Sequence, residues 1–358
     1  MEMNKKQKGY SLVACGVIVA VALTGSTSWA SSKSPVKAAK VASSTFKMGG
    51  LPDVATPTQA VKLSRAMLKG KKVRMVIYGV GYPLSDNWVN SMKVMFKQVG
   101  ADFVVKDANF KAPQLAVDLE NFINQKPDIL LVHNTDVSSL ASLMKKAQNA
   151  GIYVISINLN SNQQTDAFVG PDWGVSGTLI GTRIASDCKA KGKTEVAIIG
   201  GFGNDSQGVV TVPAAQAVFK KNGLKVVFNQ LASFDANKAQ SLTATALQQY
   251  PNLCAVLGVW DGMTGGASAA VVAAGKTKQV GVYTVDSSQP TCDLILKGEM
   301  TATVSQGAQA LGYIVAGISE YLLQSGHKPG LARTAIYLPQ QLIDSTNAAS
   351  ACYSATPK

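Results

Sequence analysis

Short apolar runs alternate with helix-like segments along most of this chain, and this alternation constrains the fold more than any other feature. The run from Val73 to Tyr78 is β-branched, too short for a helix and closed by Gly79, which predicts a buried strand. A helical period begins near Asp86, a candidate N-cap, and Gly100 stands where a left-handed C-cap would end the helix. This is a βαβ unit. Ligands bind beyond the carboxyl ends of parallel strands, so the loop 79–87 is the first place to expect a site.

The same alternation continues through the rest of the chain and repeats in its second half. Further strands are expected at 129–132, 152–157, 196–199, 226–229, 254–259, 280–285, 301–304 and 335–338, with a helix between most neighbours and a short helix at 58–68. The 358 residues are 46% apolar and only 15% charged, which is enough to build two cores. We therefore expect an α/β protein with two doubly wound parallel-sheet lobes.

The N-terminus has the pattern of a secretory signal peptide. Lys5, Lys6 and Lys8 precede an uncharged apolar run at 12–23, and a small-residue cleavage site ends at Ala30. The run is short for a membrane span of about 20 residues. We predict a signal peptide at 1–30, a leader at 31–71 and a periplasmic location. A lipid anchor on Cys15 is the less favoured alternative, because Cys15 lies inside the apolar run rather than at its end.

Four cysteines follow the predicted signal peptide, namely Cys188, Cys254, Cys292 and Cys352. An even number in an oxidising compartment favours one or two disulfides, with the pairing left open; buried free thiols are the alternative. Their spacing fits no zinc motif, and the chain has only two histidines. We expect no metal, no cofactor and no catalytic residues.

The formal net charge of +13 raises the question of an acidic partner. Lysine and arginine are spread along the whole chain, and no segment joins a basic run to interleaved aromatic residues. We therefore expect a solvated basic surface, no nucleic-acid partner and a monomer.

Eight segments, taken in order, carry a resemblance to a known family. They are DNWV (86–89), PDILLVHNTD (127–136), GIYVISINLN (151–160), VGPDWGVSGTLIG (169–181), ASFDANKAQ (232–240), AVLGVWDGM (255–263), VYTVD (282–286) and LKGEMTATVSQ (296–306). Over residues 72–344 the chain resembles periplasmic solute-binding proteins of the ribose-binding type, the type I binding components of ABC transporters.

The resemblance implies two lobes joined by a three-segment hinge that bends to close on a ligand. The first lobe would comprise 72–169 and 307–338, and the second 170–306 and 339–358. The crossings are expected near 168–172, just after Gln306 and near 337–340.

The resemblance also implies where the ligand binds. The candidate ligand-binding residues are Trp88, Asn158, Asp172, Trp173, Phe234, Trp260, Asp286 and Gln306. Three of them are the only tryptophans beyond the predicted signal peptide, and tryptophan rings stack on sugars or attract cationic amines. Each tryptophan taken alone would more often be a core residue. Asp172 and Asp286 have the alternative role of helix N-caps.

The chain departs from the ribose-binding pattern in ways that affect the ligand. Asn158 and Leu159 stand where the family has an aspartate–arginine pair, the segment 209–213 lacks the expected arginine, and Trp260 replaces an asparagine. Such a cleft has fewer donors for sugar hydroxyls. The ligand therefore need not be a simple free pentose or hexose.

Two binding functions and one enzymatic function are open from the sequence. The first is a receptor that delivers a small polar or cyclic solute, a carbohydrate first, to an ABC importer. The second is a sensor that holds a methylated amine or N-oxide in an aromatic cage and signals to a membrane receptor kinase. An exported enzyme is the weakest hypothesis, because no nucleophile elbow or paired carboxylates are present.

Overall fold

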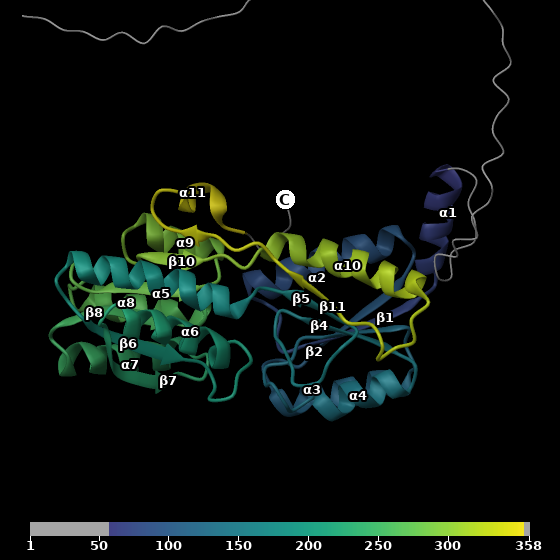
Figure 1. The fold of residues 1–358 in the computed structure, drawn as a ribbon, viewed down its shortest axis with the longest axis horizontal. Helices are drawn as coiled ribbons and strands as arrows, with labels where there is room; N and C mark the ends of the chain where they lie inside the picture. The colour runs from purple at the N-terminus through teal and green to yellow at the C-terminus, as the bar shows by residue number, and fades with distance from the viewer. Residues whose placement is uncertain (1–56, 354–358) are drawn as a thin grey trace, which may run out of the picture. The chain divides into compact units, whose positions relative to one another are not determined.

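The computed structural model describes residues 57–353, without the side chains of Pro57, Thr58, Ala60, Val61 and Ser64. The predicted signal peptide, Cys15 and the leader before residue 57 lie outside the described residues. The helix expected at 58–68 is present as α1 (Pro57–Leu68). The described chain forms two α/β lobes, each built around a six-stranded sheet (Figure 1).

The first lobe contains an all-parallel sheet with strand order β11-β5-β4-β3-β1-β2. Its strands are β1 (Lys72–Ile77), β2 (Asp102–Asp107), β3 (Ile129–Val132), β4 (Tyr153–Ile157), β5 (Ala167–Gly170) and β11 (Thr334–Tyr337). One face is covered by α2 (Pro83–Gln98) and α10 (Ala308–Ser325), and the other by α3 (Ala112–Asn124) and α4 (Ala141–Asn149) (Figure 1).

The side chains of β1 belong to the apolar clusters on both faces of the sheet in this lobe. Met75 and Ile77 join the apolar cluster under α2 and α10, and Val76 joins the cluster under α3 and α4. Side chains alternate between the two faces of a strand, and both faces of this sheet are covered. This is why a continuous apolar run, rather than an alternating one, marks the strand in the sequence.

The second lobe has strand order β12-β10-β9-β8-β6-β7. Its strands are β6 (Glu195–Gly200), β7 (Lys225–Leu231), β8 (Leu253–Gly258), β9 (Gly281–Val285), β10 (Ala302–Val304) and β12 (Leu342–Ile343). One face carries α5 (Trp173–Ala190) and α6 (Gly208–Lys221); the other carries α7 (Ala236–Gln249), α8 (Asp261–Ala273) and α9 (Gln289–Leu296). The short helix α11 (Ala348–Ala351) lies near the end of the described chain.

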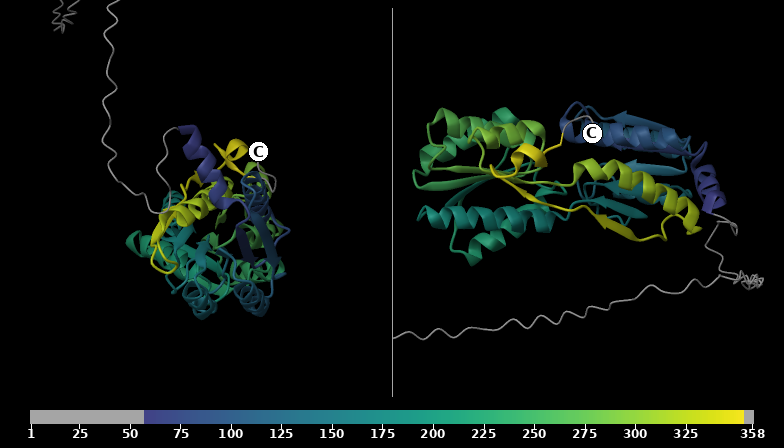
Figure 2. Two further views of the ribbon diagram at one scale, coloured as in Figure 1. Left: turned by 90° about the vertical axis from the view of Figure 1, so that its right-hand side faces the viewer. Right: turned by 90° about the horizontal axis from the view of Figure 1, so that it is seen from above.

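The chain passes three times between the two sheets. The passages run from β5 to α5, from β10 to α10 and from β11 to β12. Figure 2 shows the last of them, in yellow, running from β11 towards the second lobe. The predicted fold class of two doubly wound lobes joined by three segments is therefore confirmed.

Two local predictions need correction. Tyr82, not Asp86, is the N-cap of α2, because Pro83 begins the helix; the Asp86 carboxylate instead accepts a hydrogen bond of 2.9 Å from the Gly81 amide. Nor is the strand expected at 335–338 the last one. β12 follows it and pairs antiparallel with β10. Gly100 does adopt the predicted left-handed conformation, with φ at 72°.

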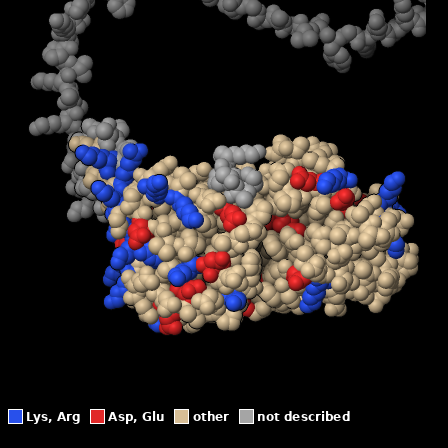
Figure 3. Space-filling model, turned by 180° about the vertical axis from the view of Figure 1, so that it is seen from behind, with Lys and Arg blue, Asp and Glu red and all other residues tan. Residues whose placement is uncertain are grey.

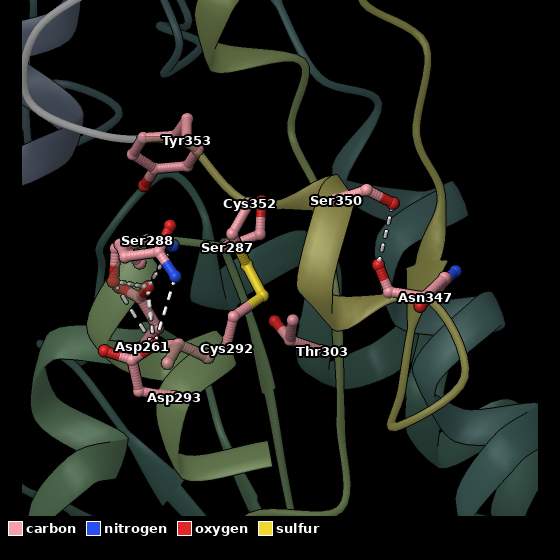
Figure 4. The surroundings of a disulfide bond; sticks show 12 residues. Asp261, Ser287, Ser288, Cys292, Asp293, Thr303, Asn347, Ser350, Cys352 and Tyr353 are labelled. Carbon is pink, nitrogen blue, oxygen red and sulfur yellow. Dashed lines mark hydrogen bonds between the residues drawn. A yellow bond between two sulfur atoms is a disulfide. The ribbon is translucent and has the colours of Figure 1, made fainter. Parts of the chain in front are cut away.

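All four cysteines that follow the predicted signal peptide form disulfides, as Cys188–Cys254 and Cys292–Cys352. The first joins α5 to β8 inside the second lobe. The second joins α9 to the residue that follows α11 (Figure 4), and so fixes the C-terminal segment onto the second lobe. The expectation that the cysteines pair is confirmed, and the structure supplies the pairing that the sequence left open.

The surface carries charges of both signs. On the face shown in Figure 3, basic side chains are more numerous towards the end that bears α1, and acidic side chains lie among them. Within residues 57–353, no helix is both long and apolar enough to cross a bilayer. The same residues contain no group of three or more His, Cys, Asp or Glu side chains placed to hold a metal ion.

Candidate functional site

A cavity of about 540 Å³ lies between the two lobes. This volume falls within the roughly 300–1,000 Å³ of small-molecule sites. The first lobe contributes Tyr78, Tyr82, Leu84, Phe110, His133, Thr135, Asn158 and Leu159. The second lobe and the crossing after β10 contribute Phe202, Asp205, Gln207, Ser233, Phe234, Asp235, Trp260 and Gln306. Most of these residues follow the carboxyl ends of strands, where a doubly wound sheet places its ligand.

Three aromatic rings of the first lobe line the cavity in contact with one another. The ring of Phe110 lies 5.5 Å from that of Tyr78 and 5.9 Å from that of Tyr82, measured between centroids. Phe110 lies directly over Gly79, because a Cβ at Gly79 would come within 2.5 Å of its ring. Gly79, which closely follows β1, has no side chain and therefore leaves the space that the Phe110 ring occupies.

The second lobe supplies a matching set of three rings. Phe234 lies 5.2 Å from Phe202 and 6.0 Å from Trp260. Glycines again lie beneath them: a Cβ at Gly201 would come 2.2 Å from the Phe234 ring, and one at Gly262 would come 2.6 Å from the Trp260 ring. Each half of the cavity is thus built from aromatic rings packed onto glycine backbone.

The two sets meet across the cavity. Tyr82 and Trp260 lie edge to face, with centroids 5.5 Å apart and an interplanar angle of 76°. The six rings therefore form one continuous row, which we call the aromatic row. Such a surface is suited to the apolar C–H faces of a cyclic ligand and to the charge of an alkylated ammonium.

Backbone strain is concentrated at this cavity. Seven non-glycine residues of the described chain have positive φ, and four of them line it: Phe110 (60°), Asn158 (63°), Ser233 (58°) and Phe234 (61°). Non-glycine residues in the left-handed region cost of order 1–3 kcal/mol each and cluster at ligand sites. The fold thus holds these side chains in conformations that a free chain disfavours.

Three buried polar atoms at the cavity have no hydrogen-bond partner among the described residues. They are His133 Nδ1, Asn158 Oδ1 and Gln306 Oε1, on side chains no more than 4% exposed. An unpaired buried polar group costs about 1–3 kcal/mol, so these atoms are placed to bond a ligand or water. Burial lowers the pKa of His133 to about 4, which leaves its imidazole neutral at pH 7.

The only ionised side chains in the lining are carboxylates. Asp205 is buried and accepts a hydrogen bond from the Gly208 amide at the start of α6, and burial raises its pKa to about 6. Asp235 is exposed and caps α7 through the amide of Lys238. The lining contains no Lys or Arg. The Lys238 ammonium donates to the hydroxyl of Ser233, a lining residue, at 3.3 Å.

The structure places half of the predicted site residues in the cavity wall. Asn158, Phe234, Trp260 and Gln306 all line it, and they come from both lobes and one crossing. Each follows the end of a strand, where the family resemblance had set it. Whether these residues touch a ligand remains a prediction.

Trp88 and Trp173 lie behind the cavity rather than in its wall. Trp88 is fully buried in the core under α2 and packs edge-on against His133, at 5.5 Å between centroids. Trp173 is 2% exposed in the core under α5, and its indole N–H donates to the Asn158 carbonyl at 2.9 Å. Both tryptophans therefore support residues that line the cavity, which agrees with the core alternative stated for each.

The two predicted aspartates also lie outside the lining. Asp172 is the N-cap of α5 and accepts bonds from the amides of Gly174 and Val175. Asp286 is fully buried, and its carboxylate accepts bonds from the Tyr353 hydroxyl and the Ser287 amide. Burial, and secondarily the charge of nearby Asp261, raises the pKa of Asp286 well above its usual range.

The remaining lining residues were not selected from the sequence as site residues. Tyr78 precedes the loop that was singled out and Tyr82 lies in it, and His133 lies in the segment 127–136 that carries the resemblance. Phe110 and Phe202 follow other strands without a distinctive motif. The signal that could have found Phe110 is the glycine after the neighbouring strand, Gly79.

Comparison with solved structures identifies the fold. Among solved structures, an ABC transporter solute binding protein from Bacillus halodurans with bound myo-inositol matches with a TM-score of 0.71, 23% identity and coverage of 79% of this chain and 97% of that chain. A periplasmic solute binding protein from Actinobacillus succinogenes with bound D-allose matches at 0.70 and 21%, covering 78% and 99%. These likenesses show a shared fold.

Sequence comparison then gives the family. A sequence model of the periplasmic binding protein domain matches residues 73–328, and the chain belongs to that family. The D-ribose/D-allose-binding protein of Pseudomonas aeruginosa is 29% identical over 57% of this chain and 65% of its own length. The D-allose-binding periplasmic protein of Escherichia coli is 32% identical over 49% and 58%. The chain thus spans about three-fifths of the length of these two relatives.

Proposed function

We propose that this protein is a periplasmic binding protein that captures an uncharged carbohydrate or cyclic polyol in the cavity between its lobes and delivers it to an ABC importer. The observation that carries the proposal is the aromatic row, which lies along a cavity whose buried polar atoms lack partners. The names of the relatives, which are ribose-binding and allose-binding proteins, support the same ligand class.

The charges of the lining support an uncharged ligand over an acidic sugar. Asp205 and Asp235 would repel a sugar phosphate or a sugar acid, and no Lys or Arg of the lining would compensate. The neutral His133, together with Asn158 and Gln306, offers hydrogen bonds suited to hydroxyl groups. A neutral ring would therefore have aromatic faces to stack on and amide groups to bond at its edge.

The proposed mechanism is closure of the lobes on the ligand. Asn158 lies in the first lobe, Phe234 and Trp260 lie in the second, and Gln306 lies on a crossing, so one ligand could contact all three parts at once. A ligand that binds the closed arrangement better than the open one shifts the population towards closure. The importer would then recognise the closed pair of lobes. No catalytic step is part of this proposal.

The aromatic row also favours one alternative, a sensor for a methylated amine or N-oxide. Tyr82, Trp260 and Phe234 present ring faces and edges at the cavity, and Asp205 adds a carboxylate. Alkylated ammonium groups bind to such rings through cation–π attraction of about 0.5–2 kcal/mol per ring. In that case the closed lobes would signal to a membrane receptor rather than feed an importer.

The experiment is a binding screen of the protein without its first 30 residues, by isothermal titration and thermal shift. The panel would contain neutral pentoses, hexoses, cyclic polyols and short oligosaccharides, with hexose phosphates, uronic acids and trimethylamine N-oxide as contrasts. We expect a neutral member to bind and the acidic members to fail. Binding confined to the amine would favour the sensor, and binding confined to the acidic sugars would reject both proposals.

A further inference from the structure

Consecutive residues near the C-terminus are buried in the cores of different lobes. Cys352 is 7% exposed and belongs to the apolar cluster that α7, α8 and α9 form in the second lobe. Tyr353 is 3% exposed and belongs to the cluster under α2 and α10, whose other buried members all lie at 73–169 or 308–338. The chain thus carries one side chain out of the second lobe and into the first.

The backbone of Tyr353 is fixed to the second lobe. The disulfide of the preceding residue anchors it to α9, and Figure 4 shows Tyr353 just beyond that bond. Its amide donates to the Ser287 carbonyl at 3.2 Å, and its carbonyl accepts from the Gln289 amide at 3.0 Å. The side chain reaches the first-lobe core from this fixed base, so movement of the lobes must change what its ring contacts.

The hydroxyl of Tyr353 fixes the direction of the ring through a bond to Asp286, which follows β9 in the second lobe. It donates to Asp286 Oδ1, and the other carboxylate oxygen of Asp286 has no partner among the described residues. Asp261, which accepts bonds from Ser288 and Thr291, is also buried nearby. Displacement of the phenol would leave a buried acid with fewer donors, which is unfavourable.

Tyr353 also stands between the ligand cavity and the crossings. It lines a hollow of about 190 Å³ together with Tyr82 and Trp260, the pair that joins the aromatic row. It lines a second hollow, of about 260 Å³, together with Gly307 and Pro339, which lie on two of the three crossings. The Tyr353 ring therefore lies between the aromatic pair that joins the lobes and two of the crossings that form the hinge.

We propose that Tyr353, held by the Cys292–Cys352 disulfide, is a latch between the lobes. It adds a non-covalent connection between the lobes to those that Ser206 makes with Thr135 and Asn134, and it favours the arrangement in which Tyr82 and Trp260 touch. Opening the lobes withdraws an apolar ring from the first-lobe core, which disfavours the open form. A protein that already populates its closed form binds its ligand with a smaller penalty, so Tyr353 is a positioning residue for ligand affinity.

The test measures the lobes directly by small-angle X-ray scattering of the ligand-free protein. The variants are Tyr353→Ala, Tyr353→Phe and the pair Cys292→Ser with Cys352→Ser. We expect a larger radius of gyration for Tyr353→Ala and for the cysteine pair, and a value close to that of the wild type for Tyr353→Phe, which keeps the ring that reaches the first lobe and loses only a bond within the second lobe. A wild-type radius in Tyr353→Ala would overturn the latch.

Matched controls come from the same lobe. Tyr283 is also buried and donates to a carboxylate, Asp187, at 2.7 Å, but its ring belongs to an apolar cluster of the second lobe itself. Tyr283→Phe, and the pair Cys188→Ser with Cys254→Ser, should therefore leave the radius unchanged. An equal increase in these controls would mean general loosening of the lobe and would also overturn the latch.

Ligand affinity gives the second measurement and rests on the proposed carbohydrate function. For a sugar that binds the wild type, a fall of the closed fraction from about one half to one twentieth raises the apparent dissociation constant about tenfold in Tyr353→Ala. An unchanged dissociation constant would contradict the latch. If no sugar binds the wild type, the proposed function fails, and the scattering result still decides the latch.

Discussion

The rings of Tyr82 and Trp260 meet edge to face, 5.5 Å apart, and this single contact joins the aromatic surfaces of the two lobes. Tyr82 stands just before α2 in the first lobe, and Trp260 just before α8 in the second. Both positions are helix N-caps that follow the carboxyl end of a strand. The contact therefore marks the point at which two structurally equivalent loops of the lobes converge on the cavity.

Removal of the Trp260 ring should weaken ligand binding more than it weakens the fold. Trp260 lines the cavity and is only partly buried, so Trp260→Ala removes a stacking surface at little cost to the core. We expect a loss of about 2 kcal/mol in binding free energy, or about 30-fold in the dissociation constant for a neutral carbohydrate ligand. Isothermal titration measures it.

The control for Trp260→Ala is Tyr313→Ala, which removes an aromatic ring from the exposed side of α10, away from the cavity. The dissociation constant of the ligand measured for Tyr313→Ala should equal that measured for the wild type. Trp88 and Trp173 are buried outside the lining, so the ligand-induced change in tryptophan fluorescence should largely vanish in Trp260→Ala. A fluorescence change that persists at full size would contradict this assignment.

A methyl group at Gly201 should disturb the cavity from beneath. A Cβ at this position would lie 2.2 Å from the Phe234 ring, so Gly201→Ala must displace the ring or the backbone. We expect a loss of about 1–3 kcal/mol in the free energy of unfolding and weaker ligand binding. Gly203→Ala is the matched control, since its Cβ would meet Leu231 at an ordinary 3.6 Å. Equal denaturation midpoints for the two variants would refute the proposed close contact.

Two side chains at the cavity, Asp205 and His133, should change the stability of the fold in opposite directions as pH changes. The pKa of Asp205 rises to about 6 on burial, so its contribution to stability is present at acid pH and is lost as pH rises from about 4 to 6. The pKa of His133 falls to about 4, so its contribution is present above its ordinary value of 6.5 and is lost as pH falls towards 4. Each pKa shift corresponds to about 3 kcal/mol at most.

Single substitutions should separate these two effects. Relative to the wild type, Asp205→Asn should gain free energy of unfolding as pH rises from 4 to 7, and His133→Gln should gain as pH falls over the same range. Urea denaturation at several pH values measures both differences. Differences that stay constant across this range would show that burial does not shift the two pKa values.

The disulfide inside the second lobe should be a large contributor to stability. Cys188 and Cys254 are fully buried and 66 residues apart in sequence. Closing a loop of this length restricts the unfolded chain by about 4 kcal/mol in the chain-entropy account. Replacing both with alanine should lower the free energy of unfolding by about 2–5 kcal/mol, with ligand affinity retained. A change below 1 kcal/mol in guanidinium denaturation would contradict this.

The fold was predictable because buried parallel strands leave a strong sequence signal. The run 129–132 is apolar throughout, since both faces of the sheet are covered, and it becomes β3 with those bounds. In contrast, β12 has two residues and pairs antiparallel at an edge, and α11 is a single turn. Such short elements have no periodicity of their own. The disulfide at Cys352 and the pairing with β10 hold them in place.

The four predicted residues that line the cavity, Asn158, Phe234, Trp260 and Gln306, all lie within three residues of the end of a strand. Trp260 comes just after β8 and Asn158 just after β4, and both line the cavity. Trp173 is also close to a strand, but the first turn of α5 directs its indole into the core, where it bonds the Asn158 carbonyl. Asp286 was expected at the ligand, and the partner that covers it, Tyr353, comes from a segment 67 residues away. The spacing of residues in the sequence reveals neither the direction of the Trp173 indole nor the contact between Tyr353 and Asp286.

The most direct test of the account is a calorimetric titration of neutral cyclic sugars and polyols into the wild type and Trp260→Ala, with the matching sugar phosphates alongside. The account predicts that at least one neutral compound binds the wild type, that its phosphate does not, and that Trp260→Ala binds the neutral compound about 30-fold more weakly. Equal binding of a neutral ligand by both proteins, or preferential binding of the phosphate, would contradict the claim that the aromatic row holds an uncharged carbohydrate.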